Sequence, residues 1–213
     1  MLNLLNKTSK KQNKPITKEQ VAVLIHFCFC NAQDLYEEAE LLKKNKKFAR
    51  GFYLCVSALE ELAKIPIVLN ALFLPPNDLK AWAGFWKRFN NHEVKQRAAK
   101  KYGQTFLKNM DKSYKDQIPD SLPINNLKWA SLYVDCLDGH PIRPNKIFKN
   151  DNRHVSSIFK ITKDRLEGLG RLHSTLDGSI RFVRITKETT IKMDGKDFKE
   201  LVATYFRDHP LKK

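Results

Sequence analysis

Apolar residues recur at steps of three and four along residues 17–74, a pattern that predicts two long amphipathic helices. Thr17 and Gln20 have the spacing of a capping box, so the first helix should begin there. It should end near Lys44, where clustered lysines suit the negative end of a helix dipole. The second helix is predicted over residues 50–74. Because the junction between the two is short and polar, they should form an antiparallel hairpin.

Two adjacent carboxylates interrupt the apolar stripe of the second predicted helix. Glu60 and Lys64 are four residues apart, the spacing of a stabilising acid-to-base pair. Glu60 and Glu61 cannot both lie opposite the core, so at least one should need a cation or donor near an apolar boundary. Pro66 lacks a backbone N–H and should kink or restart the helix just after this cluster. A plain surface ion pair beside the core is the alternative interpretation.

The rest of the chain alternates helical patterns with proline-rich turns, which predicts a mainly all-α fold. Asn77 follows Pro75-Pro76 and is positioned to cap a third helix from Leu79 to about Leu107. Further helices are predicted over residues 126–137, 153–172 and 194–206. A small β-hairpin is predicted near residues 180–193, where β-branched residues cluster.

Length and composition favour one domain. Residues 1–16 are expected to form a disordered basic tail, and residues 17–213 a single helical domain. Within it, residues 17–140 would be the core and residues 141–213 a basic extension packed on it. No apolar run approaches the roughly 20 residues of a membrane-spanning helix, and the N-terminus lacks the apolar segment of a secretory signal. A cytoplasmic protein without a membrane partner is therefore expected.

The formal net charge of +16 is unevenly distributed. Residues 80–115 hold ten lysines and arginines against two acids, and residues 139–187 hold eleven against four. Residues 1–79 hold eleven against eight. Positive charge gathered on two segments indicates contact with phosphates, and so with nucleic acid. General solubility is the alternative reason for a basic composition.

The cysteines do not form a metal-binding pattern. The four lack CxxC spacing and fall mostly at apolar helical positions, so they are predicted to be reduced core residues: Cys28, Cys30, Cys55 and Cys136. His26 and Cys30 are one helical turn apart, but no second ligand pair has a recognisable spacing. Neither a metal nor another cofactor is therefore expected.

Three motifs in order resemble the AbiV family of bacterial abortive-infection proteins, which belong to the HEPN group of small helical domains. They are ALEELAK (58–64), HEVK (92–95) and LKWASLYVD (127–135), and the resemblance covers roughly residues 20–140. It implies an all-α bundle, a homodimer and a role in stopping phage propagation. It also implies RNA or the translation machinery as the target and a phage-encoded protein as activator.

Many HEPN proteins are metal-independent ribonucleases, so the resemblance suggests that chemistry here. Such cleavage needs a base for the 2′-hydroxyl, an acid for the leaving oxygen and cations for the phosphate. His92 is the acid/base candidate, with Arg88 and Lys95 on the same face of the predicted third helix. Glu60 or Glu61 would orient His92 or pair with Lys64. Residues predicted to bind phosphate or support the site are Lys64, Lys87, Arg97, Lys100, Lys101, Lys128, Tyr133, Arg153 and His154.

One feature departs from the HEPN pattern of an arginine and a histidine with four to six residues between them. Only three residues separate Arg88 from His92. A composite site across a dimer would compensate for that spacing. The alternatives are a polar network that satisfies buried groups, and a non-catalytic dimeric module that senses a phage protein or binds RNA.

Two further groups of residues have predictions of their own. Trp82, Trp86 and Phe89 have tight helical spacing, which favours core packing or a dimer seam over base stacking. His173, near Arg171, is expected to be a helix-end residue on a solvated face.

Overall fold

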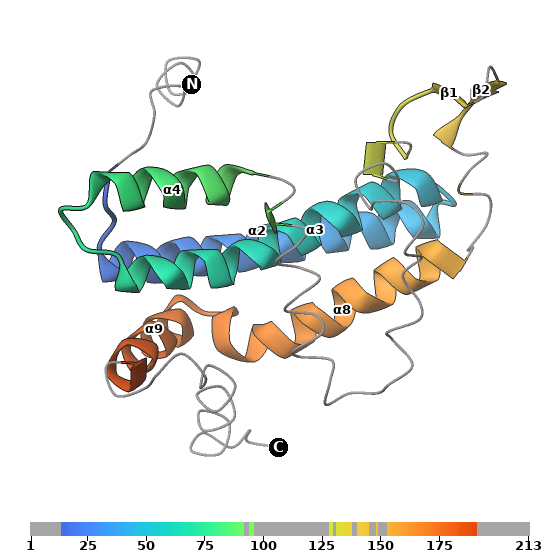
Figure 1. Ribbon diagram of the computed structural model, residues 1–213. Helices are drawn as coiled ribbons and strands as arrows, with labels where there is room; N and C mark the ends of the chain where they lie inside the picture. The colour runs from blue at the N-terminus through green and yellow to red at the C-terminus, as the bar shows by residue number, and fades with distance from the viewer. Residues whose placement is uncertain are drawn as a thin grey trace, which may run out of the picture.

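A computed structural model of the protein describes residues 14–91, 94–95, 128–129, 131–137, 140–144, 148 and 153–190. Its centre is an antiparallel hairpin of two long helices, α2 (Lys18–Lys44) and α3 (Phe48–Leu69) (Figure 1). The Thr17 side chain accepts from the Gln20 backbone N–H, and the Gln20 side chain accepts from the Thr17 N–H. The predicted capping box and hairpin are therefore confirmed, as is the mainly all-α fold.

The end of the second helix differs from the prediction. α3 runs through Pro66 to Leu69 and passes directly into a short 3-10 helix, η1 (Asn70–Phe73). A proline inside a helix costs about 3 kcal/mol. Every residue from Ile65 to Leu69 is buried, and each large apolar side chain that is buried contributes about 1.5–3 kcal/mol. Packing therefore outweighs the lost hydrogen bond, and the helix does not restart after the carboxylate cluster.

Among the described elements, α4 (Leu79–Asn90), α8 (Arg153–His173) and α9 (Leu176–Thr190) cover the central hairpin (Figure 1). α4 lies along one side, and α8 lies along the other. α9 packs mainly against α2. Asp78 caps α4 by accepting from the Ala81 N–H at 2.9 Å, so the predicted cap, Asn77, was one residue too early.

Two secondary-structure predictions were wrong. α9 occupies most of residues 180–193, where a β-hairpin was expected, because its Phe182, Val183 and Thr186 recur at a helical period on the buried face. The helix predicted over residues 126–137 stops early: among its described residues, 128–129 are helical and the others are not. The chain turns at 131–132 and enters a ribbon of β1 (Asp135–Leu137) paired antiparallel with β2 (His140–Ile142).

The third predicted helix also ends early. Asn91, directly after α4, has an extended backbone with φ −84° and ψ 120°. Its side chain accepts from the Val94 N–H at 3.0 Å and so caps a new helical turn at residues 94–95. Arg88 and Lys95 therefore do not share one continuous helix. The remainder of this prediction, residues 96–107, and the helix predicted over 194–206 lie outside the described residues.

Side chains from the whole hairpin fill two apolar clusters. One joins α2, α3, α4, α9 and the second half of α8, and the other joins the end of α2, the first half of α3 and the first half of α8. At the second cluster Gly51 allows a close approach, because a Cβ there would lie 3.0 Å from Phe159 Cζ and 3.2 Å from the Ala39 carbonyl oxygen. Across the described ranges, no helix is both long and apolar enough to cross a membrane.

Candidate functional site

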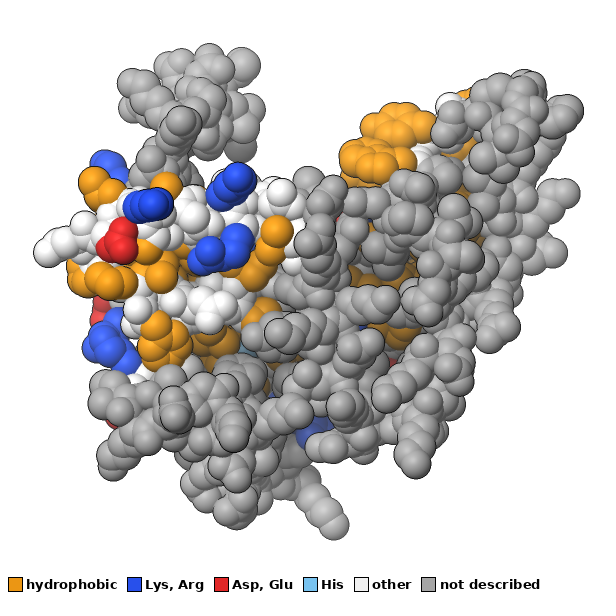
Figure 2. All heavy atoms as spheres, in the orientation of Figure 1, with side chains coloured by type: hydrophobic (Ala, Val, Ile, Leu, Met, Phe, Trp, Pro, Cys, Tyr) orange, Lys and Arg blue, Asp and Glu red, His pale blue; other side chains and the backbone are white. Residues whose placement is uncertain are grey.

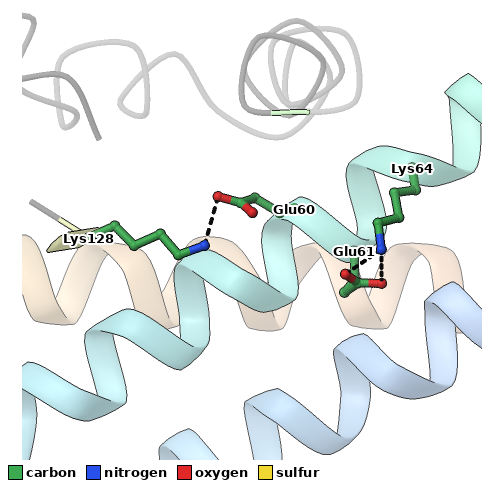
Figure 3. Close-up of polar contacts among 4 residues, drawn as sticks. All are labelled: Glu60, Glu61, Lys64 and Lys128. Carbon is green, nitrogen blue, oxygen red and sulfur yellow. Dashed lines mark hydrogen bonds and ion pairs between the residues drawn. The ribbon is translucent and has the colours of Figure 1, made fainter. Parts of the chain in front are cut away.

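A buried ion pair lies at the middle of α3. Lys128 Nζ donates to Glu60 Oε1 at 3.0 Å, and the two side chains are only 5% and 4% exposed. The same amine lies 5.0 Å from the centre of the Tyr53 ring, within range of a cation–π interaction. Glu60 is therefore the carboxylate at the apolar boundary, and its cation comes from a segment distant in sequence (Figure 3).

The second carboxylate has a different partner. Lys64 donates to both oxygens of Glu61, at 2.6 and 2.7 Å, with about a sixth of each side chain exposed. The pair predicted from the four-residue spacing, Glu60 with Lys64, is therefore wrong: Lys64 takes the carboxylate three residues before it (Figure 3). Lys64 Nζ also lies 5.1 Å from the centre of the Phe89 ring, which ties this pair to α4.

A third lysine, Lys95, interacts electrostatically with both pairs. Lys95 is 5% exposed, and burial lowers the pKa of its amine below the usual value. The positive charge of Lys64 lowers that pKa further, and the charge of Lys128 acts in the same direction. Glu60 and Glu61 partly oppose the shift. We call these five residues the polar junction: Glu60, Glu61, Lys64, Lys95 and Lys128.

Several predicted site residues lie away from the polar junction. Lys87 and Arg88 are exposed in the last turn of α4, beside the basic side chains that Figure 2 shows over that helix. Tyr133 is 59% exposed, and its ring stacks on that of Trp129. The prediction that Arg88 and Lys95 share one face of a continuous helix is therefore wrong, because Asn91 breaks the helix between them.

Other predicted site residues lie outside the described part. These are His92, Arg97, Lys100 and Lys101. Arg153 and His154 begin α8, and their side chains are likewise outside it.

Trp129 is a residue that the sequence analysis did not single out. It is 49% exposed, and its ring stacks on that of Tyr133 with centroids 5.9 Å apart and planes 28° apart. The signal available in the sequence was its spacing of four residues from Tyr133. By contrast, Trp82 is buried, and Trp86 and Phe89 pack against the core, as their spacing predicted.

A second polar cluster joins α2, α8 and α9. His173 is buried, and its Nδ1 lies 3.1 Å from Ser179 Oγ, while its carbonyl oxygen is 2.9 Å from His26 Nδ1. Burial, with a smaller contribution from the charge of His26, lowers the pKa of His173 to about 3. The prediction of a solvated helix-end residue was therefore wrong, because α9 folds back over the end of α8.

The cysteines behave as core residues where the structure describes their side chains. Cys28, Cys30 and Cys55 are free thiols, and burial raises the pKa of Cys28 to about 12. Cys30 Sγ lies 3.7 Å from His26 Nε2. Among the described side chains, no group of three or more His, Cys, Asp or Glu residues is arranged to hold a metal ion.

Comparison with known proteins assigns the chain to a family. The AbiV family model, which represents a HEPN-type domain, matches residues 20–167. The chain belongs to the AbiV family. No curated protein and no solved structure matches it. The match extends past β2 and includes the first two-thirds of α8, so the AbiV domain contains both the polar junction and the helix that packs on the opposite side of the hairpin.

Proposed function

We propose that this AbiV-family protein acts in the cytoplasm as an abortive-infection toxin directed at RNA, with the polar junction holding an RNA phosphate. The observation that carries the proposal is the charge of the junction. Three lysines face two glutamates, and both glutamates are already paired. Among the side chains that the structure describes at the junction, the buried amine of Lys95 is the excess cation. A phosphate would compensate that charge, because an anion favours the protonated amine.

Ribonuclease chemistry is the form of this function that we favour. Lys95 lies three residues after His92, the acid/base candidate. An imidazole titrates near neutral pH, and the lowered pKa of Lys95 moves that amine toward the range of acid/base catalysis. His92 would exchange protons with the 2′-hydroxyl or the leaving oxygen while the lysines stabilise the charged phosphate. A toxin that blocks translation by binding RNA without cutting it would use the same phosphate contacts.

The protein's partners follow from the same proposal. A homodimer would allow an arginine of the second chain to complete the site, which compensates for the short spacing between Arg88 and His92. Because an RNA-directed toxin must be restrained until infection, a phage-encoded protein would release it.

Inducible expression in a bacterial host tests the proposal. Wild type should arrest growth and fragment total RNA, whereas His92→Ala and Lys95→Met should restore both growth and intact RNA. Lys80→Met is the matched control, because Lys80 is exposed on α4 and away from the junction. Growth arrest with intact RNA would show that the toxin does not act by cleaving RNA. RNA fragmentation that persists in His92→Ala would show that His92 is not a catalytic residue.

A non-catalytic dimeric module is the second candidate. The complete, buried Glu60–Lys128 pair favours it, because such a pair can serve packing alone. This candidate predicts a dimer in sedimentation and RNA or phage-protein binding that survives in His92→Ala. It also predicts no RNA cleavage by purified protein.

A further inference from the structure

An exposed aromatic surface lies next to the polar junction. Trp129 and Tyr133 stack on each other, and Val134 beside them is 68% exposed. Figure 2 shows hydrophobic side chains gathered on the surface near the base of the β1–β2 ribbon. We call Trp129 and Tyr133 the aromatic platform.

Contacts of the polar junction fix the backbone that carries the aromatic platform. Lys128 precedes Trp129 and extends inward to Glu60 on α3, so the two neighbouring side chains are directed oppositely. Buried Ser131 Oγ donates to the Lys128 carbonyl oxygen at 2.6 Å and fixes the turn between the two rings. The aromatic platform is therefore positioned by buried polar contacts while its rings remain accessible, an arrangement suited to a ligand-binding surface.

An exposed arginine directly follows the ribbon. Asp135 at the start of β1 pairs with Ile142 at the end of β2, so exposed Arg143 leaves the ribbon at the same end at which Val134 enters it. Exposed aromatic rings next to a cation are the groups that bind single-stranded nucleic acid, since the rings stack on bases and the cation contacts the backbone.

We infer that Trp129 and Tyr133 form a stacking platform for an unpaired base of single-stranded RNA, with Arg143 contacting an adjacent phosphate. The inference rests on the proposed function only in taking RNA as the ligand, and it does not require cleavage. Trp82, Trp86 and Phe89 pack against the core, so Trp129 and Tyr133 are the rings that we assign to base stacking.

RNA fits this surface better than a protein partner does. A standard protein interface uses about 20–30 residues a side with an apolar centre. The platform offers two rings, followed in the chain by exposed Val134, on a chain of net charge +16. Stacking of one or two bases needs no larger surface, and the charge favours a polyanion.

Fluorescence anisotropy with the full-length protein tests the inference. The probe is a short single-stranded RNA with 2′-O-methyl groups, which block attack by the 2′-oxygen, alongside an abasic oligomer with the same number of phosphates. Trp129→Ala and Tyr133→Ala should each weaken binding of the base-containing probe by about 5- to 150-fold. Trp129→Phe should restore most of the loss. Arg143→Ala should reduce the slope of log affinity against log salt by about one.

Phe27→Ala is the matched control, because Phe27 is 62% exposed on α2 and far from the platform in sequence; its affinity should equal that of wild type. Unchanged affinity in Trp129→Ala would overturn the platform while leaving RNA binding intact. An equal loss for the abasic oligomer would also overturn it, as would a changed oligomeric state at unchanged RNA affinity. If wild type binds neither oligomer, RNA is not a ligand of this protein, and both the proposed RNA target and the stacking platform are overturned.

Discussion

Lys128 and Glu60 form an ion pair across 68 residues of sequence, with Nζ and Oε1 3.0 Å apart and both side chains almost wholly excluded from water. The pair fastens the turn before the β1–β2 ribbon to the middle of α3. Desolvating two charges is costly, so a buried pair stabilises the fold only while both partners are present.

Removing one partner of this pair should be strongly destabilising. Glu60→Met leaves the Lys128 amine buried without its carboxylate, and Lys128→Met leaves the Glu60 carboxylate without its amine. Each single variant should lower the free energy of unfolding by about 3–5 kcal/mol. The double variant should lose much less than the sum, because no uncompensated charge remains. Urea denaturation of the four proteins measures the difference.

The neighbouring pair provides the control for that experiment. Glu61 and Lys64 are partly exposed, so Glu61→Gln should cost only about 1 kcal/mol. Additive losses in Glu60→Met and Lys128→Met would contradict the coupling inferred from their contact.

Lys95 should lower the stability of the folded protein, because its buried charge is suited to binding an anion rather than to packing. Its lowered pKa means that the folded state disfavours the charged amine, so wild type should gain stability as rising pH removes that proton. Lys95→Met should raise the melting temperature at pH 7 and flatten its dependence on alkaline pH. Inorganic pyrophosphate should stabilise wild type more than the variant, since the anion compensates the charge.

Thermal melts with and without pyrophosphate measure both effects. Lys80→Met, at an exposed position of α4, should change neither. A lower melting temperature for Lys95→Met would show that the lysine has a stabilising partner rather than an excess charge.

Sequence patterns correctly predicted the helices that are determined by residues close together in the chain. The Thr17 capping box and the apolar periods of α2, α3 and α8 need only neighbours along the chain, and these predictions were confirmed. Residues 180–190 were misread because β-branched residues suggested strands, whereas burial of Phe182 and Val183 against the core favours a helix.

The candidate site depends on contacts that spacing cannot reveal. Helical periodicity predicted Lys64 as the partner of Glu60. The cation that binds Glu60 is instead Lys128, 68 residues away in the sequence. Likewise, the outward direction of Tyr133 follows from the turn at residues 131–132, where a continuous helix had been predicted. Family resemblance placed these residues in one domain without giving their pairing.

Gly51 should be intolerant of a side chain. An added Cβ would lie 3.0 Å from Phe159 Cζ and 3.2 Å from the Ala39 carbonyl oxygen, so α2 or α8 would have to shift. Gly51→Ala should lower the free energy of unfolding by about 1–3 kcal/mol, the usual cost of overpacking. Gly168→Ala is the matched control, because nothing lies within 4 Å of its Cβ position inside α8. It should stabilise by up to about 1 kcal/mol through helix propensity. Equal effects of the two substitutions in urea denaturation would contradict the close packing at Gly51.

Acid should weaken the protein through His173. Its pKa falls from the usual 6.5 to about 3 on folding, so the unfolded chain takes up a proton first. The stabilisation is complete above pH 6.5 and is lost progressively as pH falls toward 3, which amounts to about 2 kcal/mol at pH 5. His173→Gln carries no titrating group, so it should be less stable at pH 8 but should lose less stability between pH 8 and pH 5. Urea denaturation at both values measures the two slopes. An equal loss in the variant would mean that the acid sensitivity arises elsewhere, because His173 is the buried imidazole joining α8 to α9 through Ser179 and Phe182.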